Sequence, residues 1–293
     1  MSNTVNYASK YLDMLDRVYK AGAVTSILEA DPNMYRFSEQ NEKTIYLQTL
    51  ALDGLGDYNR DTGYSDGDMT IDWEPYTLTA DRSKKFKIDT LDAREAYMTI
   101  GKVGSEFQRL KVNPELDAYR FEKLCYYAGL NATPATLDYD DVMSAIRAGV
   151  KALDDAEVPK EGRVLFVSSQ VEQAMEDSGD LYKSINVNSN NGVVNTQIRN
   201  FNGMDVLPVP LARFYNNFDF GSNGFTVNAS GKAINFIILY KPAAIAVVKH
   251  RAMSIIDPQN NGTHDGFIYK YRIYHDLIVP TQMVNGIYVH RKA

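Results

Sequence analysis

The sequence lacks features that would define several whole classes of protein. It contains a single cysteine, Cys125, which excludes intrachain disulfides and cysteine-based zinc sites. No apolar run approaches the roughly 20 residues of a membrane-spanning helix, and the polar start of the chain does not have the layout of a signal peptide. We therefore expect a soluble cytoplasmic product in which Cys125 is a small, buried apolar side chain.

The chain is also short of positive charge. Its net charge is −6 and its isoelectric point is near 5.3, which argues against binding nucleic acid through overall charge. A local basic patch remains compatible with contact to DNA. Tyrosine and phenylalanine are abundant, at 20 and 12 residues, and such side chains suit both cores and protein interfaces.

No motif is complete enough to support catalysis or cofactor binding. Residues 63–67 match the G-x-S-x-G pattern of hydrolases around Ser65, but their flanks are polar and give neither the strand nor the helix that this site needs. Gly54 and Gly56 begin a dinucleotide loop that has no third glycine. The four histidines lack the spacing of metal ligands. We expect no enzyme, no cofactor and no metal, and keep a hydrolase using Ser65 as an alternative.

The most informative segment is a β-type ribbon with a long polar arm. Residues 44–50 form a strand-type run, residues 53–68 are rich in glycine and aspartate, and the chain returns through 76–79 into a basic strand, 82–88. An isolated two-stranded hairpin is only marginally stable in water. An arm of this length therefore suggests that a neighbouring subunit covers it.

The rest of the pattern predicts an α+β protein. Asn113 is placed to cap a helix that begins at Pro114 and ends near Gly129. The Asn285 and Gly286 pair is typical of a two-residue hairpin turn. Further expected elements are a helix at about 139–156, a helix capped by Ser168 or Ser169, and strands at 163–167, 205–209, 234–240 and 267–279. Residues 244–248 are expected to form either another strand or a short helix after Pro242.

Two strands carry charged residues on one face. Residues 267–279 alternate, so one face is expected to carry Phe267, Tyr269, Tyr271 and Ile273 and the other face Lys270, Arg272 and Asp276. The basic strand 82–88 has two interpretations. One is an ordinary solvated face with Phe86 turned inward, which the small contribution of exposed ion pairs favours. The other is a stripe that pairs with the acidic arm of an adjacent subunit.

The order and spacing of these parts resemble the major capsid proteins of tailed bacteriophages, which have the Hong Kong 97-like fold. The resemblance covers nearly the whole chain. It rests on the polar arm, on residues 86–89 and 92–95, on the helix 113–128, on 158–168 and on the late segments 276–279 and 285–288. It implies an N-terminal arm (1–42), an extended-loop ribbon or β-hairpin (43–90), a peripheral domain with a long spine helix (91–136), an α/β axial domain (137–257) and return strands of the peripheral domain (258–293).

The resemblance also implies a function. Copies of the chain would form pentamers and hexamers that tile an icosahedral virion capsid around double-stranded DNA, bound without sequence specificity and without a membrane. Assembly would take place in the host cytoplasm, with a portal and a separate scaffold protein as partners. Because the chain moves from Met1 directly into the arm, a fused scaffolding segment is expected to be absent or supplied by that separate protein.

The residues expected at contacts between subunits lie on the arm and on the basic strand. Buried aromatic side chains dominate interface energetics, which favours the aromatic residues of the arm. Trp73 fits packing at the base of the ribbon equally well. The candidate intersubunit contacts are Tyr58, Arg60, Tyr64, Trp73, Arg82 and Lys84.

Two further alternatives remain at this point. An encapsulin-type nanocompartment shell has the same fold but encloses protein cargo in place of DNA. A binding module that acts as a monomer is the other, and a test of assembly separates it from both kinds of shell.

Overall fold

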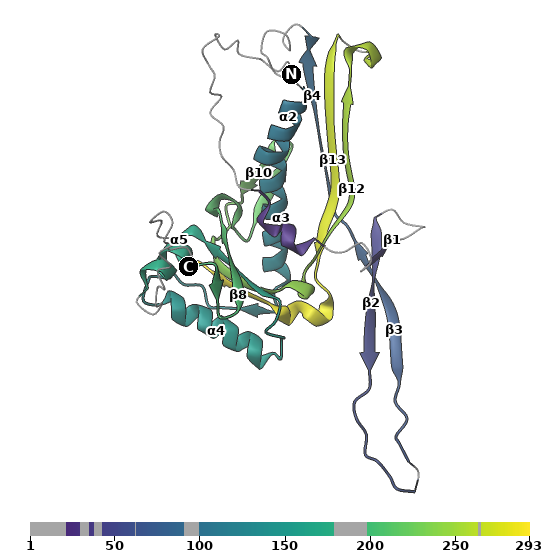
Figure 1. Cartoon of the computed structure of the whole chain (residues 1–293), viewed down its shortest axis with the longest axis vertical. Helices are drawn as coiled ribbons and strands as arrows, with labels where there is room; N and C mark the ends of the chain where they lie inside the picture. The colour runs from purple at the N-terminus through teal and green to yellow at the C-terminus, as the bar shows by residue number, and fades with distance from the viewer. Residues whose placement is uncertain are drawn as a thin grey trace, which may run out of the picture.

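The computed structural model describes residues 22–29, 35–37, 43–61, 63–90, 100–178, 198–262 and 265–293. These residues form an elongated molecule made of a long sheet, a compact α/β part and a protruding ribbon, with one long helix beside the sheet (Figure 1). Most of the expected N-terminal arm (1–42) lies outside the described residues; Val24–Leu28 form the short 3-10 helix η1. The helices of the described residues include none that is long and apolar enough to span a membrane.

The long sheet has three antiparallel strands in the order β12-β13-β4. The central strand is β13 (Gly266–Ile278), and its neighbours are β12 (Ile245–Ile256) and β4 (Ala80–Asp89). The alternation of apolar and polar residues predicted β13 correctly. Strand β12 is longer than the expected 244–248 because it pairs with β13 along nearly its whole length.

The long helix is continuous through Asn113, so the predicted cap at this residue is wrong. It comprises α2 (Ile100–Phe107), the π-helical turn η3 (Gln108–Val112) and α3 (Asn113–Tyr127). Asn113 has helical angles, φ −60° and ψ −46°, and its N–H donates to the carbonyl of Gln108, five residues back. Pro114 lacks an N–H and its ring crowds the preceding turn, and the widened π turn accommodates both effects.

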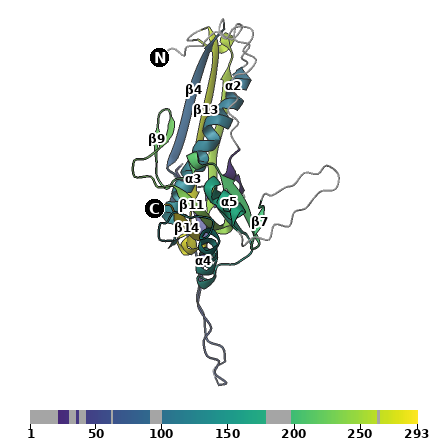
Figure 2. The ribbon, with the colours of Figure 1, turned by 90° about the vertical axis from the view of Figure 1, so that its left-hand side faces the viewer.

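A glycine in α2 allows the helix to lie close to the long sheet. A Cβ atom built on Gly104 would lie 2.6 Å from a ring carbon of Tyr269 on β13. Phe107 packs edge-on against Phe86 of β4, with 4.9 Å between the ring centroids. Figure 2 shows the helix running along this sheet. The glycine that weakens the helix in isolation therefore serves its packing in the fold.

The compact part contains a six-stranded sheet in the order β5-β14-β11-β6-β8-β7. Helix α3 covers one face of this sheet, where Phe121 contacts Phe166, and the helices α4 and α5 cover the other face. Strands β6 and β11 are buried on both faces, as their continuous apolar runs predict. The elements are β5 (Leu130–Asn131), α4 (Val142–Asp155), β6 (Arg163–Ser168), α5 (Ser169–Asp177), β7 (Asn200–Phe201), β8 (Met204–Val209), β11 (Ile234–Tyr240) and β14 (Ile287–Arg291).

Helix α5 begins as expected from its serine pair. Ser168 is the N-cap, and its hydroxyl oxygen accepts a hydrogen bond from the N–H of Val171. Ser169 is the first helical residue. The capping-box spacing from Ser169 to Glu172 therefore does not describe this helix start, because the box would need Ser169 as the cap.

The predicted hairpin at Asn285 and Gly286 is wrong. Residues Thr281–Gly286 form the 3-10 helix η7, which carries the chain from the long sheet to β14 in the other sheet. A Cβ atom on Gly286 would lie 2.7 Å from the Cβ of Ala243, so glycine is needed here for close packing rather than for a tight turn. The remaining short elements are η4 (Leu211–Arg213), β9 (Phe218–Gly221), β10 (Gly224–Val227), η5 (Lys241–Ala243) and η6 (Pro258–Asn260).

Each of the two sheets takes strands from segments that are far apart in the sequence. Strand β12 belongs to the long sheet together with β4, and β14 belongs to the six-stranded sheet together with β5. The chain thus passes from the six-stranded sheet to the long sheet between β11 and β12, and returns between β13 and β14. The two parts of the molecule are therefore linked by several crossings of the backbone.

Candidate functional site

The ribbon extends away from both sheets (Figure 1). Strand β2 (Thr44–Leu52) pairs antiparallel with β3 (Met69–Thr77) along their full length, and β1 (Tyr35–Phe37) joins β2 at the base. The predicted ribbon is present, and its second strand is β3. The basic strand that follows, β4, pairs with β13 and belongs to the long sheet.

The outer half of the ribbon exposes apolar side chains. Leu55 is fully exposed and Tyr64 is 91% exposed. Tyr58 packs edge-on against Tyr64, with 5.2 Å between the ring centroids. Other exposed apolar residues along the ribbon are Leu50, Leu52, Tyr58, Met69 and Ile71. Clustered apolar exposure of this kind marks surfaces that bind another protein.

The tip is a hydrogen-bonded turn and not a catalytic elbow. Asn59 and Gly63 exchange backbone hydrogen bonds of 3.2 and 2.7 Å, and Gly63 has φ +86°, which favours glycine. Residues 64–67 run from this turn toward β3 as exposed chain. Ser65 therefore has neither a buried strand before it nor a helix after it, in agreement with the sequence-based rejection of a hydrolase site.

Trp73 lies in β3 near the base of the ribbon. The guanidinium carbon of Arg36 lies 4.7 Å from the centroid of its ring system, a cation–π contact within the subunit. The side chain nevertheless remains 39% exposed. Trp73 thus packs against its own chain on one side and leaves the other side open to a partner.

The root of the ribbon is fastened to the long helix by Asp276 on β13. One of its carboxylate oxygens accepts hydrogen bonds from the N–H and the hydroxyl of Thr79, at 2.8 and 2.9 Å. The other accepts from the hydroxyl of Tyr119, at 2.8 Å. Burial, together with the charge of Asp276, raises the pKa of Tyr119, which keeps its hydroxyl protonated as a donor. The alternation of β13 assigned Asp276 to the polar face of the strand; in the structure it is buried there by partners from distant segments.

Arg82 and Lys84 lie on the inner face of β4. The Nε of Arg82 is 2.5 Å from a carboxylate oxygen of Glu115, and its Nη2 donates to the carbonyl of Gly221 at 2.7 Å. The Nζ of Lys84 donates to the carbonyl of Ser222 at 2.9 Å. Both cations therefore hold the tip of the β9–β10 hairpin within the subunit. Their role between subunits stays a prediction, as does that of Tyr58, Arg60, Tyr64 and Trp73.

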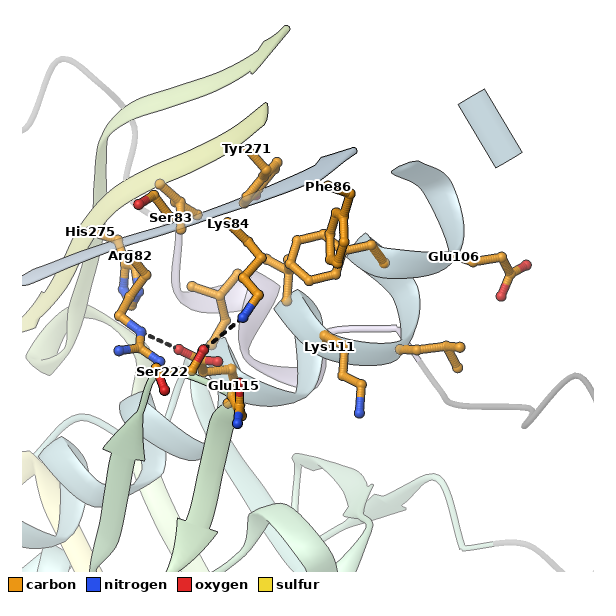
Figure 3. Close-up of a pocket in the computed structure, with 17 residues that line it drawn as sticks. Arg82, Ser83, Lys84, Phe86, Glu106, Lys111, Glu115, Ser222, Tyr271 and His275 are labelled. Carbon is orange, nitrogen blue, oxygen red and sulfur yellow. Dashed lines mark hydrogen bonds and ion pairs between the residues drawn. The ribbon is translucent and has the colours of Figure 1, made fainter. Parts of the chain in front are cut away.

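A cavity of about 350 Å³ lies beneath this hairpin tip (Figure 3). Its walls come from β4, from the π turn of the long helix and from β13. The lining combines aromatic and aliphatic side chains with charged ones. The lining residues include Lys84, Phe86, Phe107, Lys111, Asn223 and Tyr271.

His275 also lines this cavity. It is buried, and its Nδ1 has no hydrogen-bond partner among the described residues. Burial, reinforced by the charge of Arg120, lowers the pKa of His275 to about 4. The imidazole is therefore neutral near pH 7, and it packs edge-on against Tyr119 at 5.1 Å.

A second buried cluster fastens η1 to the long helix, and nothing in the sequence pattern indicated it. The carboxylate of Asp117 accepts hydrogen bonds from the N–H groups of Val24 and Thr25, both at 3.0 Å, and from the hydroxyl of Thr25 at 2.6 Å. It also forms a 2.6 Å ion pair with Arg213. These partners lie 92 to 96 residues away along the chain, too far for a spacing rule to find.

The described residues give little support for metal binding or for a reactive thiol. Within that part of the chain, no group of three or more His, Cys, Asp or Glu side chains could hold a metal ion. Cys125 lies in α3 against the core, and burial raises the pKa of its thiol to about 12. Cys125 packs against the core as predicted, but its side chain is partly rather than fully buried.

Comparison with known proteins gives a result at the level of fold. No family model and no curated protein matches the sequence. Among solved structures, a chain titled Mycobacterium phage Che8 matches with a TM-score of 0.65 at 14% identity, covering 99% of this chain and 96% of that one. The capsid structure of the cyanophage P-SCSP1u matches with a TM-score of 0.71 at 10% identity, covering 98% and 92%. The mature capsid of bacteriophage PhiM1 matches with a TM-score of 0.64 at 13% identity, covering 88% and 84%.

These likenesses extend over nearly the whole chain and nearly the whole of each related chain. They define the class of the protein: a mixed helix-and-sheet fold with one long helix, shared with bacteriophage capsid subunits. The resemblance to the major capsid proteins of tailed phages, first noted from the order of the sequence elements, is confirmed at the level of fold.

Proposed function

We propose that this chain is the major capsid protein of a tailed bacteriophage. In this role, copies assemble through pentamers and hexamers into an icosahedral shell that encloses double-stranded DNA. The observation that carries the proposal is the exposed apolar ribbon, with Leu55 and Tyr64 at its tip, on a chain with the fold of phage capsid subunits. A monomer gains no stability from such a ribbon, whereas an assembly buries it.

Assembly through many modest contacts fits the physics of the chain. Each subunit of a shell touches several neighbours, and linked contacts reinforce one another without a single tight site. We propose that Tyr58, Arg60, Tyr64 and Trp73 contribute such contacts. The role is structural and not catalytic. The shell would be the virion capsid, formed in the host cytoplasm with a portal and a separate scaffold protein as partners.

The Hong Kong 97-like division of the chain is part of this proposal. In it, the ribbon within 43–90 is the extended loop, and the helix within 91–136 is the spine of a peripheral domain. The α/β part within 137–257 is an axial domain, and the segments 1–42 and 258–293 are an N-terminal arm and return strands. An encapsulin-type compartment has the same fold, but the solved structures named above are from phages and do not favour it.

Light scattering combined with negative-stain imaging of the purified protein tests the proposal, with and without a candidate scaffold protein. Closed shells, or rings of five and six subunits, are the expected result. A monodisperse monomer under every condition would contradict it. Nuclease-protected DNA inside particles from infected cells would separate a phage capsid from a protein-filled compartment.

A further inference from the structure

The long helix covers one face of the long sheet, and the described part of the chain leaves the opposite face open (Figure 2). Consecutive side chains of a strand point to opposite faces, so β4 turns Phe86 toward the helix and its odd-numbered residues away from it. The odd-numbered residues of β4, from 81 to 89, are all exposed. On β13 the exposed residues Lys270 and Arg272 lie on this same face, because the register pairs Lys270 with Lys85. We call this surface the open face of the long sheet.

The open face carries more positive than negative charge, although the whole chain has a net charge of −6. Arg272 donates to both carboxylate oxygens of Asp81, at 2.9 and 2.6 Å. The lysines of the face have no hydrogen bond or ion pair in the described part of the chain. The unpaired charge of the face therefore lies on its lysines. Four cations less two carboxylates give a net charge of +2, from Lys85, Lys87, Lys270, Arg272, Asp81 and Asp89.

Two of the lysines lie directly opposite each other. Lys85 pairs with Lys270 in the register of β4 and β13, and like charges at opposed positions destabilise a sheet. An external anion would relieve this repulsion. Serine hydroxyls lie beside the lysines, because Ser254 on β12 is opposite Lys270 and Ser83 is two residues from Lys85. All four side chains line an open recess, and cations with hydroxyl groups are the donors that bind phosphates.

The composition of the open face favours DNA over a protein partner. Protein interfaces are depleted of lysine and enriched in aromatic side chains, whereas Lys, Arg and Ser supply contacts to DNA phosphates. The only Phe, Tyr or Trp of this face in the described strands is Tyr274, which is partly buried and donates its hydroxyl to the carbonyl of Leu78 at 2.9 Å. Single strands bind by stacking their bases on exposed aromatic side chains. The face therefore suits the backbone of a duplex.

We propose that the open face of the long sheet binds the phosphate backbone of packaged double-stranded DNA through Lys85, Lys87 and Lys270, without reading its sequence. The inference rests on the proposed shell function and adds the surface that meets the DNA, which places this face on the inside of the shell. Three contacts in one subunit are weak, but they are repeated in every subunit of a shell. The negative net charge of the whole chain opposes tighter binding.

Binding of a short fluorescent duplex by dissociated subunits tests the site. A fourfold rise in salt concentration should lower the affinity about 40-fold, because about three phosphates release their counterions. Lys85→Gln with Lys270→Gln leaves one lysine, so the same rise should lower the affinity only about threefold. The matched control is Lys151→Gln with Lys232→Gln, two exposed lysines of the compact part, which should keep the salt dependence of the wild type. Equal effects of the two pairs would overturn the proposal.

A charge reversal separates loss of binding from loss of folding. Lys270→Glu replaces the repulsion with Lys85 by an attraction, so the unfolding midpoint should stay the same or rise. The affinity for the duplex should nevertheless fall further than in Lys270→Gln. A lowered midpoint together with the lower affinity would assign the loss of binding to misfolding and contradict the proposal.

An acidic protein is the competing occupant of this face. Poly-L-glutamate, added at the same concentration of negative charge as the duplex, is the probe for it. The duplex should bind more tightly. Polyglutamate that binds as tightly as the duplex, with the same loss in the Lys85→Gln, Lys270→Gln protein, would assign the face to an acidic polypeptide and overturn the proposal.

Photo-crosslinking in DNA-filled particles tests where the face lies. In a Cys125→Ser background, which removes the only native thiol, Lys87→Cys is labelled with 4-azidophenacyl bromide before assembly and packaging. Irradiation should link subunits to DNA, and filled particles without such links would overturn the proposal. Normal shells from the Lys85→Gln, Lys270→Gln protein, with unchanged duplex binding, would reject this site and leave the shell function intact. Absence of shells from the wild-type chain would reject the function itself, and with it packaged DNA as the ligand.

Discussion

The hydroxyl of Tyr119 on the long helix donates a 2.8 Å hydrogen bond to the carboxylate of Asp276 on the long sheet. The same carboxylate accepts two hydrogen bonds from Thr79, in the turn between the ribbon and β4. One buried acid thus joins the helix, the sheet and the root of the ribbon. The direction in which the ribbon leaves the subunit is therefore set by the rigid part of the fold, which suits an element that must reach a neighbour.

Replacing Asp276 should loosen this junction. Asp276→Ala leaves the hydroxyl of Tyr119 and the N–H of Thr79 without their acceptor, which should lower the free energy of unfolding by about 1–3 kcal/mol. Denaturant titration measures the loss. Asp81→Ala is the matched control, because the ion pair between Asp81 and Arg272 is exposed on both sides and should contribute at most about 1 kcal/mol. Equal losses from both variants would contradict the assignment.

Removal of Asp117 should release η1 from the long helix. Asp117→Ala leaves Arg213 buried without its counter-charge, which should cost about 3–5 kcal/mol of stability. It should also speed hydrogen exchange at the N–H groups of Val24 and Thr25, which the carboxylate holds. Glu29→Ala serves as the control, since Glu29 is half-exposed and pairs more loosely with Arg120, at 3.3 Å. Unchanged exchange at Val24 and Thr25 in the Asp117 variant would refute the role of this cluster.

Acid should destabilise the subunit through His275. Its pKa is about 4 in the folded chain and about 6.5 for an exposed histidine, so the folded state binds fewer protons than the unfolded state between these pH values. The stability that neutral His275 provides is complete above about pH 6.5 and is lost as the pH falls toward 4, by up to about 3 kcal/mol. The measurement compares unfolding at pH 7 and pH 4.5 in wild type and His275→Phe. An identical pH dependence in both would exclude His275 as the cause.

Shortening the ribbon should abolish assembly without unfolding the subunit. Asp53 and Asp68 already face each other, with hydrogen bonds of 3.2 and 2.9 Å between them. Residues 54–67 can therefore be replaced by an Asn-Gly turn that closes the two strands. The shortened chain should keep the unfolding midpoint of the wild type and form no shells in light scattering. Normal shells from this chain would show that the ribbon tip is not an assembly element.

Much of the fold could be predicted because local pattern and burial agree. Strand β11 matches its predicted range, since a run that is buried on both faces needs no knowledge of its partners. Strand β13 and the ribbon followed from alternation and turn chemistry. The predicted helix cap at Asn113 and the predicted turn at Asn285 and Gly286 were wrong for the same reason. Each resembles a local signal for the start of a helix or for a turn, but packing against distant residues determines the conformation.

The polar contacts were the least predictable part of the candidate site. Asp276 was assigned to the polar face of its strand, but its partner Thr79 lies 197 residues away and could not be predicted. Arg82 and Lys84 were identified as cations, but only the fold shows that the β9–β10 hairpin lies against them. Sequence spacing carries no information about contacts of this length.

The most direct test is electron cryo-microscopy of the assembled particle at a resolution that traces the backbone of the ribbon. The account predicts a closed icosahedral shell in which residues 53–68 of each subunit lie on a neighbouring copy. A shell in which every ribbon contacts only its own subunit, or protein that never forms a closed particle, would contradict it.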